Sequence, residues 1–282
     1  MKRIEIRKKT YSPYGREKDG KMKLDKIDSG NGFDFGRTSA DYARFRDIYP
    51  QSMYDKLIDF GIGIRGQNIL DLGSGTAVLP LKLYHTGARF TATDISENQI
   101  NYGRQLAREK GCENISFKAC SAEDTGFDDN CFDAVTAVQC FQYFDAEKAA
   151  VEIHRVLKPN GLFCKIFMDW LPFEDEKIAE MELLVLKYNP SWSGCGFKSY
   201  RYNYPEWAKG RFEIETIHSY NAELSFTKAQ WLGRIKTCRG VGASLSADEV
   251  SAFEAEYARL LEKYSEPLHL KHQVHIEVYR AV

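Results

Sequence analysis

The sequence predicts an α/β fold, in which a mostly parallel sheet is covered by helices on both faces. Short apolar segments alternate with amphipathic segments of helical length over residues 64–168, which is the pattern of repeated strand–helix units. One of the strands ends in Asp71 and runs directly into a turn that contains Gly73 and Gly75. The next strand ends in a second acid, Asp94, about twenty residues further on, as in nucleotide-binding α/β proteins.

Each element of this core has a local signal in the sequence. Five apolar segments have the length of buried parallel strands, namely residues 69–72, 90–94, 115–117, 132–138 and 162–168. Helices are expected from about residue 76, from Ser96 and over residues 146–157. Ser96 stands three residues before Gln99 as a capping box, and Asp145 is a plausible cap for the helix that follows it.

We expect a single domain over residues 37–282, preceded by a flexible polar arm at 1–36. Within the domain, residues 64–168 form the ligand-binding core. Residues 169–206 interrupt the alternation with many Trp, Tyr, Pro and Gly residues around one amphipathic segment, which indicates a helical and aromatic insertion that acts as a lid. Residues 207–282 are expected to form a strand, two capped helices and a last strand.

Composition excludes several classes of protein. The formal net charge of −1 gives no sign of a nucleic-acid partner or of an acidic membrane surface. No apolar run is long enough to span a bilayer, and the seven cysteines include no C-x-x-C pair. His269, His272 and His275 are close in sequence, but strand alternation places His272 and His275 on opposite faces, so no metal site is expected. We expect a cytoplasmic protein that is a monomer or a homodimer.

The turn after Asp71 has the chemistry of a cofactor-binding loop. Gly73 and Gly75 lack the Cβ atoms that would block a close approach of the ligand, and Asp94 can accept hydrogen bonds from both hydroxyls of a ribose. A dinucleotide fingerprint requires a third glycine where Val78 stands, which weakens the alternative of an NAD-type oxidoreductase. A non-catalytic cofactor-binding protein is the other alternative that remains.

Several motifs together resemble the class I methyltransferases of the group called type 11, over roughly residues 40 to 168. The motifs that resemble this family are Asp71–Thr76, Thr93–Ser96, Ser121–Asp124 and Arg155–Gly161. The resemblance implies a Rossmann-like three-layer sandwich with a seven-stranded sheet whose last strand is antiparallel. It also implies S-adenosylmethionine as the cofactor and transfer of its methyl group by in-line displacement.

Loop chemistry, position and resemblance together give a set of expected cofactor-binding residues. They are Asp71, Gly73, Ser74, Gly75, Asp94, Ile95, Ala122, Glu123, Gln139 and Arg46. Two positions depart from the family pattern. Ser121 stands where the family usually has Asp, and Thr125-Gly126 stands where it usually has Leu-Pro.

The acceptor is expected to be a small molecule, for which a carboxylate is one candidate. Residues 230–240 loosely resemble the late helix of trans-aconitate-type methyltransferases, where basic residues lie near the acceptor. The candidate catalytic residues are Gln139, Tyr143 and Tyr42, and the candidate substrate-binding residues are Phe141, Trp170, Trp192, Arg234 and Arg239. The alternative is that the aromatic residues pack in the core and that the arginines form a solvated basic face.

Overall fold

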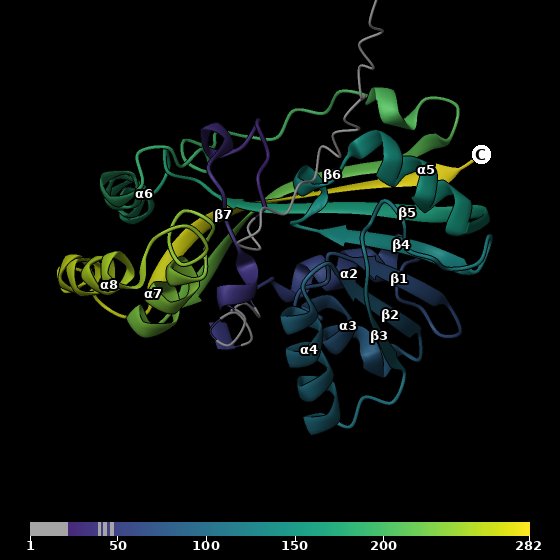
Figure 1. Cartoon of the computed structure of the whole chain (residues 1–282), viewed down its shortest axis with the longest axis horizontal. Helices are drawn as coiled ribbons and strands as arrows, with labels where there is room; N and C mark the ends of the chain where they lie inside the picture. The colour runs from purple at the N-terminus through teal and green to yellow at the C-terminus, as the bar shows by residue number, and fades with distance from the viewer. Residues whose placement is uncertain (1–21, 39–40, 42–43, 46–47) are drawn as a thin grey trace, which may run out of the picture.

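A computed structural model of the chain describes residues 22–38, 41, 44–45 and 48–282. Its centre is a seven-stranded sheet with the order β3-β2-β1-β4-β5-β7-β6 (Figure 1). The strands are β1 (Asn68–Leu72), β2 (Arg89–Asp94), β3 (Ile115–Ala119), β4 (Phe132–Val138), β5 (Leu157–Trp170), β6 (Phe212–Phe226) and β7 (Leu268–Ala281). β7 runs antiparallel to both β5 and β6, whereas the other described strand pairs are parallel, which confirms the predicted sheet.

Helices cover both faces of the sheet. The α-helices are α2 (Gln51–Asp59), α3 (Val78–Leu83), α4 (Glu97–Glu109), α5 (Ala146–Val156), α6 (Glu176–Tyr188), α7 (Lys228–Lys236) and α8 (Ala247–Leu261). Short 3-10 turns lie at Asp28–Gly30, Phe35–Thr38, Tyr84–Thr86, Phe141–Tyr143 and Glu206–Ala208. The predicted caps are present: the Ser96 side chain accepts from the Gln99 amide, and the Asp145 side chain accepts from the Lys148 amide. These bonds satisfy N–H groups that a helix start otherwise leaves unpaired.

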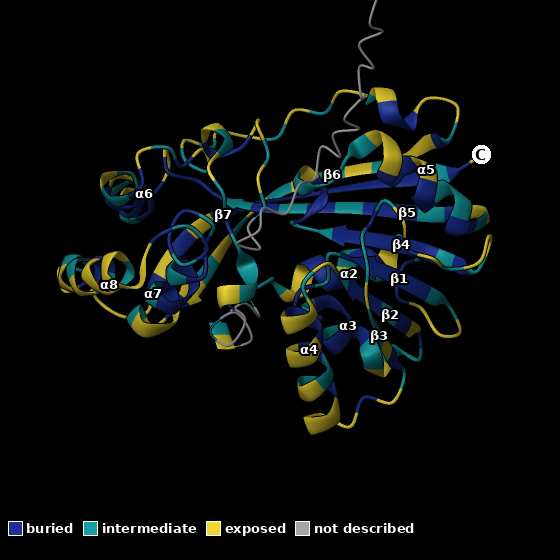
Figure 2. Ribbon diagram, in the orientation of Figure 1, coloured by how far each residue is buried: buried dark blue, intermediate teal, exposed yellow. Residues whose placement is uncertain are grey.

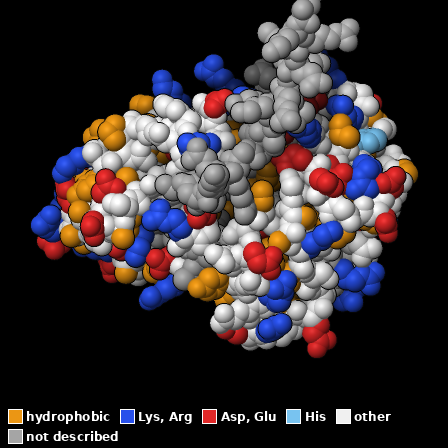
Figure 3. Space-filling view, in the orientation of Figure 1, with side chains coloured by type: hydrophobic (Ala, Val, Ile, Leu, Met, Phe, Trp, Pro, Cys, Tyr) orange, Lys and Arg blue, Asp and Glu red, His pale blue; other side chains and the backbone are white. Residues whose placement is uncertain are grey.

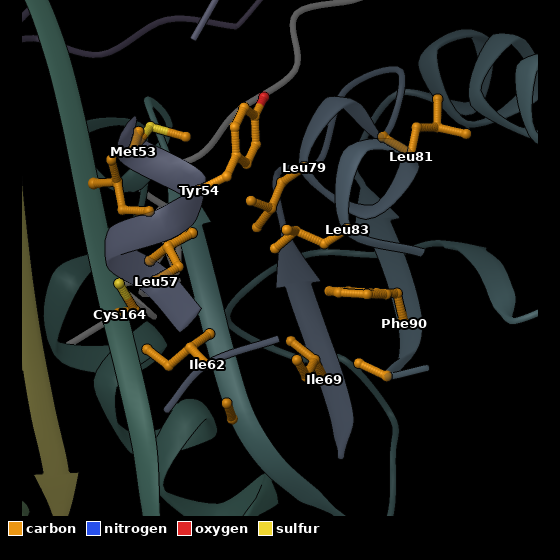
Figure 4. Packing of buried hydrophobic residues seen from close by; sticks show 14 of the residues in the cluster. Met53, Tyr54, Leu57, Ile62, Ile69, Leu79, Leu81, Leu83, Phe90 and Cys164 are labelled. Atoms are coloured by element: carbon orange, nitrogen blue, oxygen red, sulfur yellow. The ribbon is translucent and has the colours of Figure 1, made fainter. Parts of the chain in front are cut away.

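The two faces of the sheet carry separate cores. On one face, Met53 and Leu57 of α2 belong to one core with Ile69 of β1 and Leu79 of α3 (Figure 4). On the other face, α5 packs with Phe163 and the aromatic residues around it. The central strands β1, β4 and β7 are mostly buried, whereas the edge strand β6 and the outer sides of the helices are exposed in many places (Figure 2). The result is the predicted three-layer arrangement.

A third core lies beyond the sheet, where α6, α7 and α8 gather at one end of the long strands β5 and β7 (Figure 1). Trp170 and Trp192, from the segment expected to be a lid, pack there with Trp231 of α7 and Phe253 of α8. Residues 169–206 therefore share one hydrophobic core with the C-terminal helices. None of the helices that the structure describes is long and apolar enough to cross a membrane.

The expectation of a flexible arm is wrong for residues 22–36. Phe33 is fully buried, and it packs with Ile27 and with Ala243, more than two hundred positions along the chain. A bridge joins Met22 to Phe33, and the Asp34 amide donates to the Ala243 carbonyl at 2.9 Å. The segment is polar with isolated apolar residues, so its composition gives no sign of partners that lie far away in sequence. Residues 1–21 of the expected arm lie outside the described part of the chain.

A buried ion pair fastens this segment, which we call the cap (residues 22–38), to the C-terminal layer. The Asp28 carboxylate lies 2.5 Å from the guanidinium of Arg239, with the two side chains 2% and 11% exposed. The Ser193 amide and hydroxyl donate to the same Asp28 oxygen at 2.7 and 2.9 Å. The cap is thereby held against two distant loops.

Replacing Arg239 with glutamine is expected to release the cap. The change leaves the Asp28 carboxylate buried without its cation, and breaking a buried pair in this way costs about 3–5 kcal/mol. Hydrogen exchange followed by mass spectrometry should show faster exchange for amides of residues 22–38. Asp59→Asn is the control, because it breaks an exposed pair with Lys56. Unchanged exchange in the Arg239→Gln protein would contradict the role of this pair.

Candidate functional site

A cavity of about 450 Å³ lies at the carboxyl ends of β1, β2 and β4. Its size falls within the range of small-molecule sites. The loops after these strands line it from one side, and the cap lines it from the other. The lining residues are Met22, Phe33, Asp34, Phe35, Gly36, Gly73, Gly75, Asp94, Ile95, Ser96, Glu97, Asn98, Gln99, Cys120, Ser121, Ala122, Glu123, Val138, Gln139, Cys140, Tyr143 and Phe144.

Asp94 sets the shape of the glycine turn. One carboxylate oxygen accepts from the Gly75 amide at 3.0 Å, and the other accepts from the Ser96 amide at 2.8 Å. Gly73 and Gly75 both have left-handed backbone conformations, with φ of 58° and 56°. A carboxylate has about four lone-pair sites, so Asp94 in the cavity lining can accept from a ligand as well as from these amides.

Asp71 supports the same turn from below. Its side chain accepts from the Ser74 hydroxyl at 2.5 Å and from the Thr136 hydroxyl at 2.6 Å, and the residue is 2% exposed. Burial raises the pKa of the Asp71 carboxyl to about 6, against the opposing effect of these two hydrogen bonds. Neither Asp71 nor Ser74 is among the residues that line the cavity. Both were expected to bind the cofactor, and the structure gives them the role of shaping the loop.

The loop after β3 forms a second wall. Ala122 and Glu123 line the cavity as expected, and Ile95 lies at its rim with 44% of its surface exposed. The Ser121 hydroxyl donates to the Glu123 carboxylate, and the other Glu123 oxygen accepts from the Asp145 amide at 2.9 Å. The departure from the family pattern at Ser121 therefore has a local consequence, because Ser121 holds Glu123 against the start of α5.

Gln139 lies at the end of β4 and lines the cavity as the sequence predicted. Its backbone amide donates to the Ile166 carbonyl at 2.9 Å, and its side-chain amide donates to the Met168 carbonyl. Its φ of 58° is a left-handed conformation that is uncommon outside glycine. These two bonds to β5 hold Gln139 in this conformation.

The cap supplies an aromatic wall that sequence analysis missed. Phe33, Phe35 and Tyr143 form a cluster in which the ring centroids are 5.6 to 5.7 Å apart, within the range of favourable aromatic contacts. Gln99 of α4 donates to the Phe35 carbonyl at 3.2 Å and so ties the cap to the cofactor side. No local signal could have found Phe33 and Phe35, because they are isolated aromatic residues in a polar stretch.

Three aromatic residues expected to bind substrate lie in cores instead. Phe141 points away from the cavity and packs against Phe163 and Trp207, with centroids at 5.5 and 5.1 Å. Trp170 and Trp192 lie in the core beneath α6 and α7, where the Trp170 indole donates to Glu182 at 2.6 Å. The expectation failed because residue type alone does not show whether an aromatic side chain near a strand end packs in a core or lines a cavity.

The two arginines are also placed away from the cavity lining. Arg234 is 1% exposed, its guanidinium lies 5.0 Å from the centre of the Trp231 ring, and it contacts Nε2 of His272 at 2.8 Å. Burial and the charge of Arg234 lower the pKa of His272 to about 3, so this imidazole stays neutral. Arg239 holds Asp28 of the cap. Neither arginine forms the solvated basic face, and neither reaches the cavity; Tyr42 and Arg46 lie outside the described residues.

Comparison with known proteins identifies the family. A family model described as a methyltransferase domain matches residues 70–164, which contain the glycine turn, Asp94 and Gln139. Residues 70–164 thus form a methyltransferase domain of the class I, type 11 group. Such methyltransferases use S-adenosylmethionine, and this is the cofactor of the chain.

Relatives of this methyltransferase differ in how much of their length the match covers. An uncharacterized methyltransferase-like protein of Schizosaccharomyces pombe is 29% identical over 202 residues, covering 66% of the chain and 75% of that protein. The ubiquinone/menaquinone biosynthesis C-methyltransferase UbiE of Psychromonas ingrahamii is 39% identical, and the match covers 45% of the chain and 54% of UbiE. The demethylmenaquinone methyltransferase of Clavibacter sepedonicus is 37% identical, with 35% of the chain and 40% of that enzyme covered. The chain thus spans about half or less of these two quinone enzymes.

Solved structures support the fold of the methyltransferase. The YcgJ protein from Bacillus subtilis superposes with a TM-score of 0.50 at 22% identity, covering 80% of this chain and 96% of that one. A Bacillus halodurans C-125 protein described as a methyltransferase gives a TM-score of 0.51 at 17% identity, covering 81% of this chain and 98% of that one. At these identities the likeness concerns the fold alone.

The cavity itself fits the cofactor. Oε1 of Gln99 is buried in the lining and accepts no hydrogen bond from the residues that the structure describes, so it is open to a donor from a ligand. Asp94 offers a carboxylate to the same space, and Ala122 offers an apolar surface. S-adenosylmethionine carries hydrogen-bond donors, two adjacent hydroxyls and a flat ring. An amide oxygen, a carboxylate and an apolar surface are groups that can bind these parts.

Proposed function

We propose that this methyltransferase transfers the methyl group of S-adenosylmethionine to an uncharged small molecule with an apolar or aromatic surface. The observation on which this rests is the wall formed by Phe33, Phe35 and Tyr143 on the cavity. Among the described lining residues there is no Lys, Arg or His to pair with an anion, whereas Asp34 and Glu123 are acidic. An acceptor that carries a carboxylate would meet like charge there, which disfavours it.

In this proposal, the cofactor lies across the carboxyl ends of the strands. Asp94 would accept from the ribose hydroxyls, Ile95 and Ala122 would flank the adenine, and the turn at Gly75 and Gln139 would hold the methionine part. When bound, the cofactor supplies an electrophilic methyl group on a sulfonium sulfur. The protein's own contribution is alignment of the acceptor and exclusion of water, which the cap over the cavity favours.

The positions of Arg234 and Arg239 remove the reason for expecting a carboxylate acceptor. One guanidinium is enclosed by aromatic rings, and the other is paired with Asp28. Two relatives are named for methyl transfer to demethylmenaquinone and for C-methylation in ubiquinone and menaquinone biosynthesis, and an acceptor of that kind would suit the aromatic wall. On the face shown in Figure 3, Lys and Arg are interspersed with Asp and Glu, and no continuous basic stripe for a nucleic acid is visible outside the grey atoms.

The test is transfer of tritium from methyl-labelled S-adenosylmethionine to three acceptors: a naphthohydroquinone, a naphthol and trans-aconitate. We expect label in a neutral aromatic acceptor and none in trans-aconitate. Phe35→Ala should raise the KM for the aromatic acceptor while the cofactor Kd stays the same, and Phe173→Ala, at a residue 67% exposed, is the control. Label in trans-aconitate alone would contradict the proposal. Cofactor binding without transfer to either aromatic acceptor would favour a non-catalytic cofactor-binding protein.

A further inference from the structure

A chain of titratable side chains lies on one face of β5 and β7, outside the described lining of the cavity. Lys165 contacts Glu277 at 2.7 Å, and Nε2 of His275 contacts the other oxygen of Glu277 at 2.8 Å. The ring of Tyr200 is stacked on His275, with centroids 4.6 Å apart and planes 12° apart. The Tyr200 hydroxyl donates to the carboxylate of Asp169. Asp169 is the last of these titratable side chains and the one furthest along β5.

Asp169 is placed next to the cofactor site by the pairing of β4 with β5. The two strands are parallel, with Val138 opposite Ile166, so both reach the carboxyl edge of the sheet together. Gln139 follows Val138, lines the cavity and donates through its side chain to the carbonyl of Met168. Asp169 is the next residue after Met168. Asp169 therefore directly follows the residue that anchors Gln139, at the edge of the sheet where α/β proteins bind ligands.

The acids that line the cavity are already used by the fold. Asp94 and Glu123 accept from backbone amides of neighbouring loops, and Asp34 accepts from the Gly36 amide at 2.8 Å. These bonds orient the three carboxylates toward the backbone of neighbouring loops. Glu97 lies at the exposed rim. A methyl acceptor that carries a proton needs a base from elsewhere.

The surroundings of Asp169 give it the properties of a base. Burial raises the pKa of Asp169, and the Tyr200 hydroxyl and the charge of Arg234 on α7 partly oppose this. Glu182 on α6 also faces it. Burial and the Asp169 charge raise the pKa of Tyr200, so the Tyr200 hydroxyl remains a donor. The other groups that face Tyr200 are Tyr49, His275 and Glu277. A carboxyl group with a raised pKa takes up a proton more readily near neutral pH.

We propose that Asp169 takes the proton from the methyl acceptor and that Tyr200 positions its carboxylate. This inference rests on the proposed function. It specifies further that the acceptor atom carries a proton, as a phenol or hydroquinone hydroxyl does, or the ring carbon beside that hydroxyl. The nucleophilic atom of the acceptor forms a bond to the methyl carbon, with the electron pair of the broken carbon–sulfur bond left on sulfur. The proton that the acceptor loses passes to Asp169.

The first test measures turnover in Asp169→Asn, which keeps the size of the side chain and removes its basicity. With the naphthol acceptor, we expect kcat to fall about 100-fold or more, while the Kd for S-adenosylmethionine stays unchanged. Glu180→Gln is the matched control, because Glu180 accepts from Tyr264 at 2.5 Å in a similar pair between α6 and the end of α8. A kcat for Asp169→Asn equal to that of Glu180→Gln would overturn the proposal.

A second variant, Tyr200→Phe, keeps the ring on His275 and removes the hydrogen bond to Asp169. Because that bond favours the ionised carboxylate, its loss should raise the pKa of Asp169. The acidic limb of the pH profile of kcat should then move to higher pH. Tyr264→Phe, which removes the matching hydroxyl from Glu180, should leave the profile in place. A profile unchanged by Tyr200→Phe would overturn the positioning role of Tyr200.

A third readout needs no turnover. Para-nitrophenol is titrated into protein saturated with S-adenosylhomocysteine, and the absorbance of its phenolate reports the pKa of the bound phenol. A carboxylate beside the phenol disfavours the phenolate, so the pKa of the bound phenol should be lower in Asp169→Asn than in the native protein. Equal pKa values, or no binding of para-nitrophenol to the native protein, would overturn the inference. Loss of S-adenosylhomocysteine binding by the native protein would instead overturn the proposed function.

Discussion

Replacing Asp94 with alanine is expected to weaken the binding of S-adenosylmethionine about 100-fold or more. The change removes an acceptor for the ribose hydroxyls and also the partner of two backbone amides, at Gly75 and Ser96. Hydrogen bonds to charged groups contribute about 1.5–3 kcal/mol each, and about 1.4 kcal/mol corresponds to tenfold in affinity. Isothermal titration calorimetry with the purified full chain measures the effect.

Asp124→Ala is the matched control for Asp94→Ala. Asp124 is an exposed acid on the next loop, and it is not among the lining residues that the structure describes. Its loss changes the net charge by the same amount and should leave the Kd unchanged. Equal Kd values for the native and Asp94→Ala proteins would show that the cofactor binds elsewhere.

Replacing Gly73 with alanine is expected to destabilise the protein and to abolish cofactor binding. A Cβ atom at this position would lie 2.7 Å from Cβ of Cys140 and 2.9 Å from its sulfur. The φ of 58° adds the cost of a left-handed conformation, about 1–3 kcal/mol for a residue other than glycine. Relief of the contact would move the loop after β1 or the loop after β4, and both of them line the cavity.

Gly111→Ala separates the two contributions to this effect. Gly111 has a φ of 68°, and nothing lies within 4 Å of the position that its Cβ would take. Gly111→Ala therefore has only the cost of the left-handed backbone conformation and no steric contact. Urea unfolding should show a free energy of unfolding that is about 1–3 kcal/mol lower for Gly73→Ala than for Gly111→Ala, which is the usual cost of overpacking. Equal stabilities would mean that the contact between Gly73 and Cys140 does not constrain the loop.

The core of the fold could be predicted because its signals are local. The strands around Asp71 and Asp94 are short apolar runs, and caps at Ser96 and Asp145 mark the helix starts within a few residues. In parallel α/β units, the order of these local elements also dictates which strand ends meet. Gln139 could be placed at the cavity for the same reason, since its position after β4 determines the edge of the sheet at which it lies.

The acceptor side could not be predicted because it depends on contacts between distant segments. Phe33 and Tyr143 are about a hundred positions apart, and nothing in either neighbourhood indicates their contact. Trp170 and Arg234 have the residue types of a binding site, but the packing of α6 on α7 encloses them together. Residue type alone does not distinguish a cation that binds a ligand from one that is buried against aromatic rings.

The sequence by itself determined the class of the protein and the glycine turn that lines its cavity, because periodicity, caps and turn residues act over a few positions. Only the tertiary structure decided what closes the cavity and what surrounds the acceptor. The cap is held by Asp28 against Arg239, and the pairing of β4 with β5 brings Gln139 to the carbonyl of Met168, the residue before Asp169. Both arrangements join segments that are separated along the chain, and their stability comes from burying groups that are complementary only once the chain has folded.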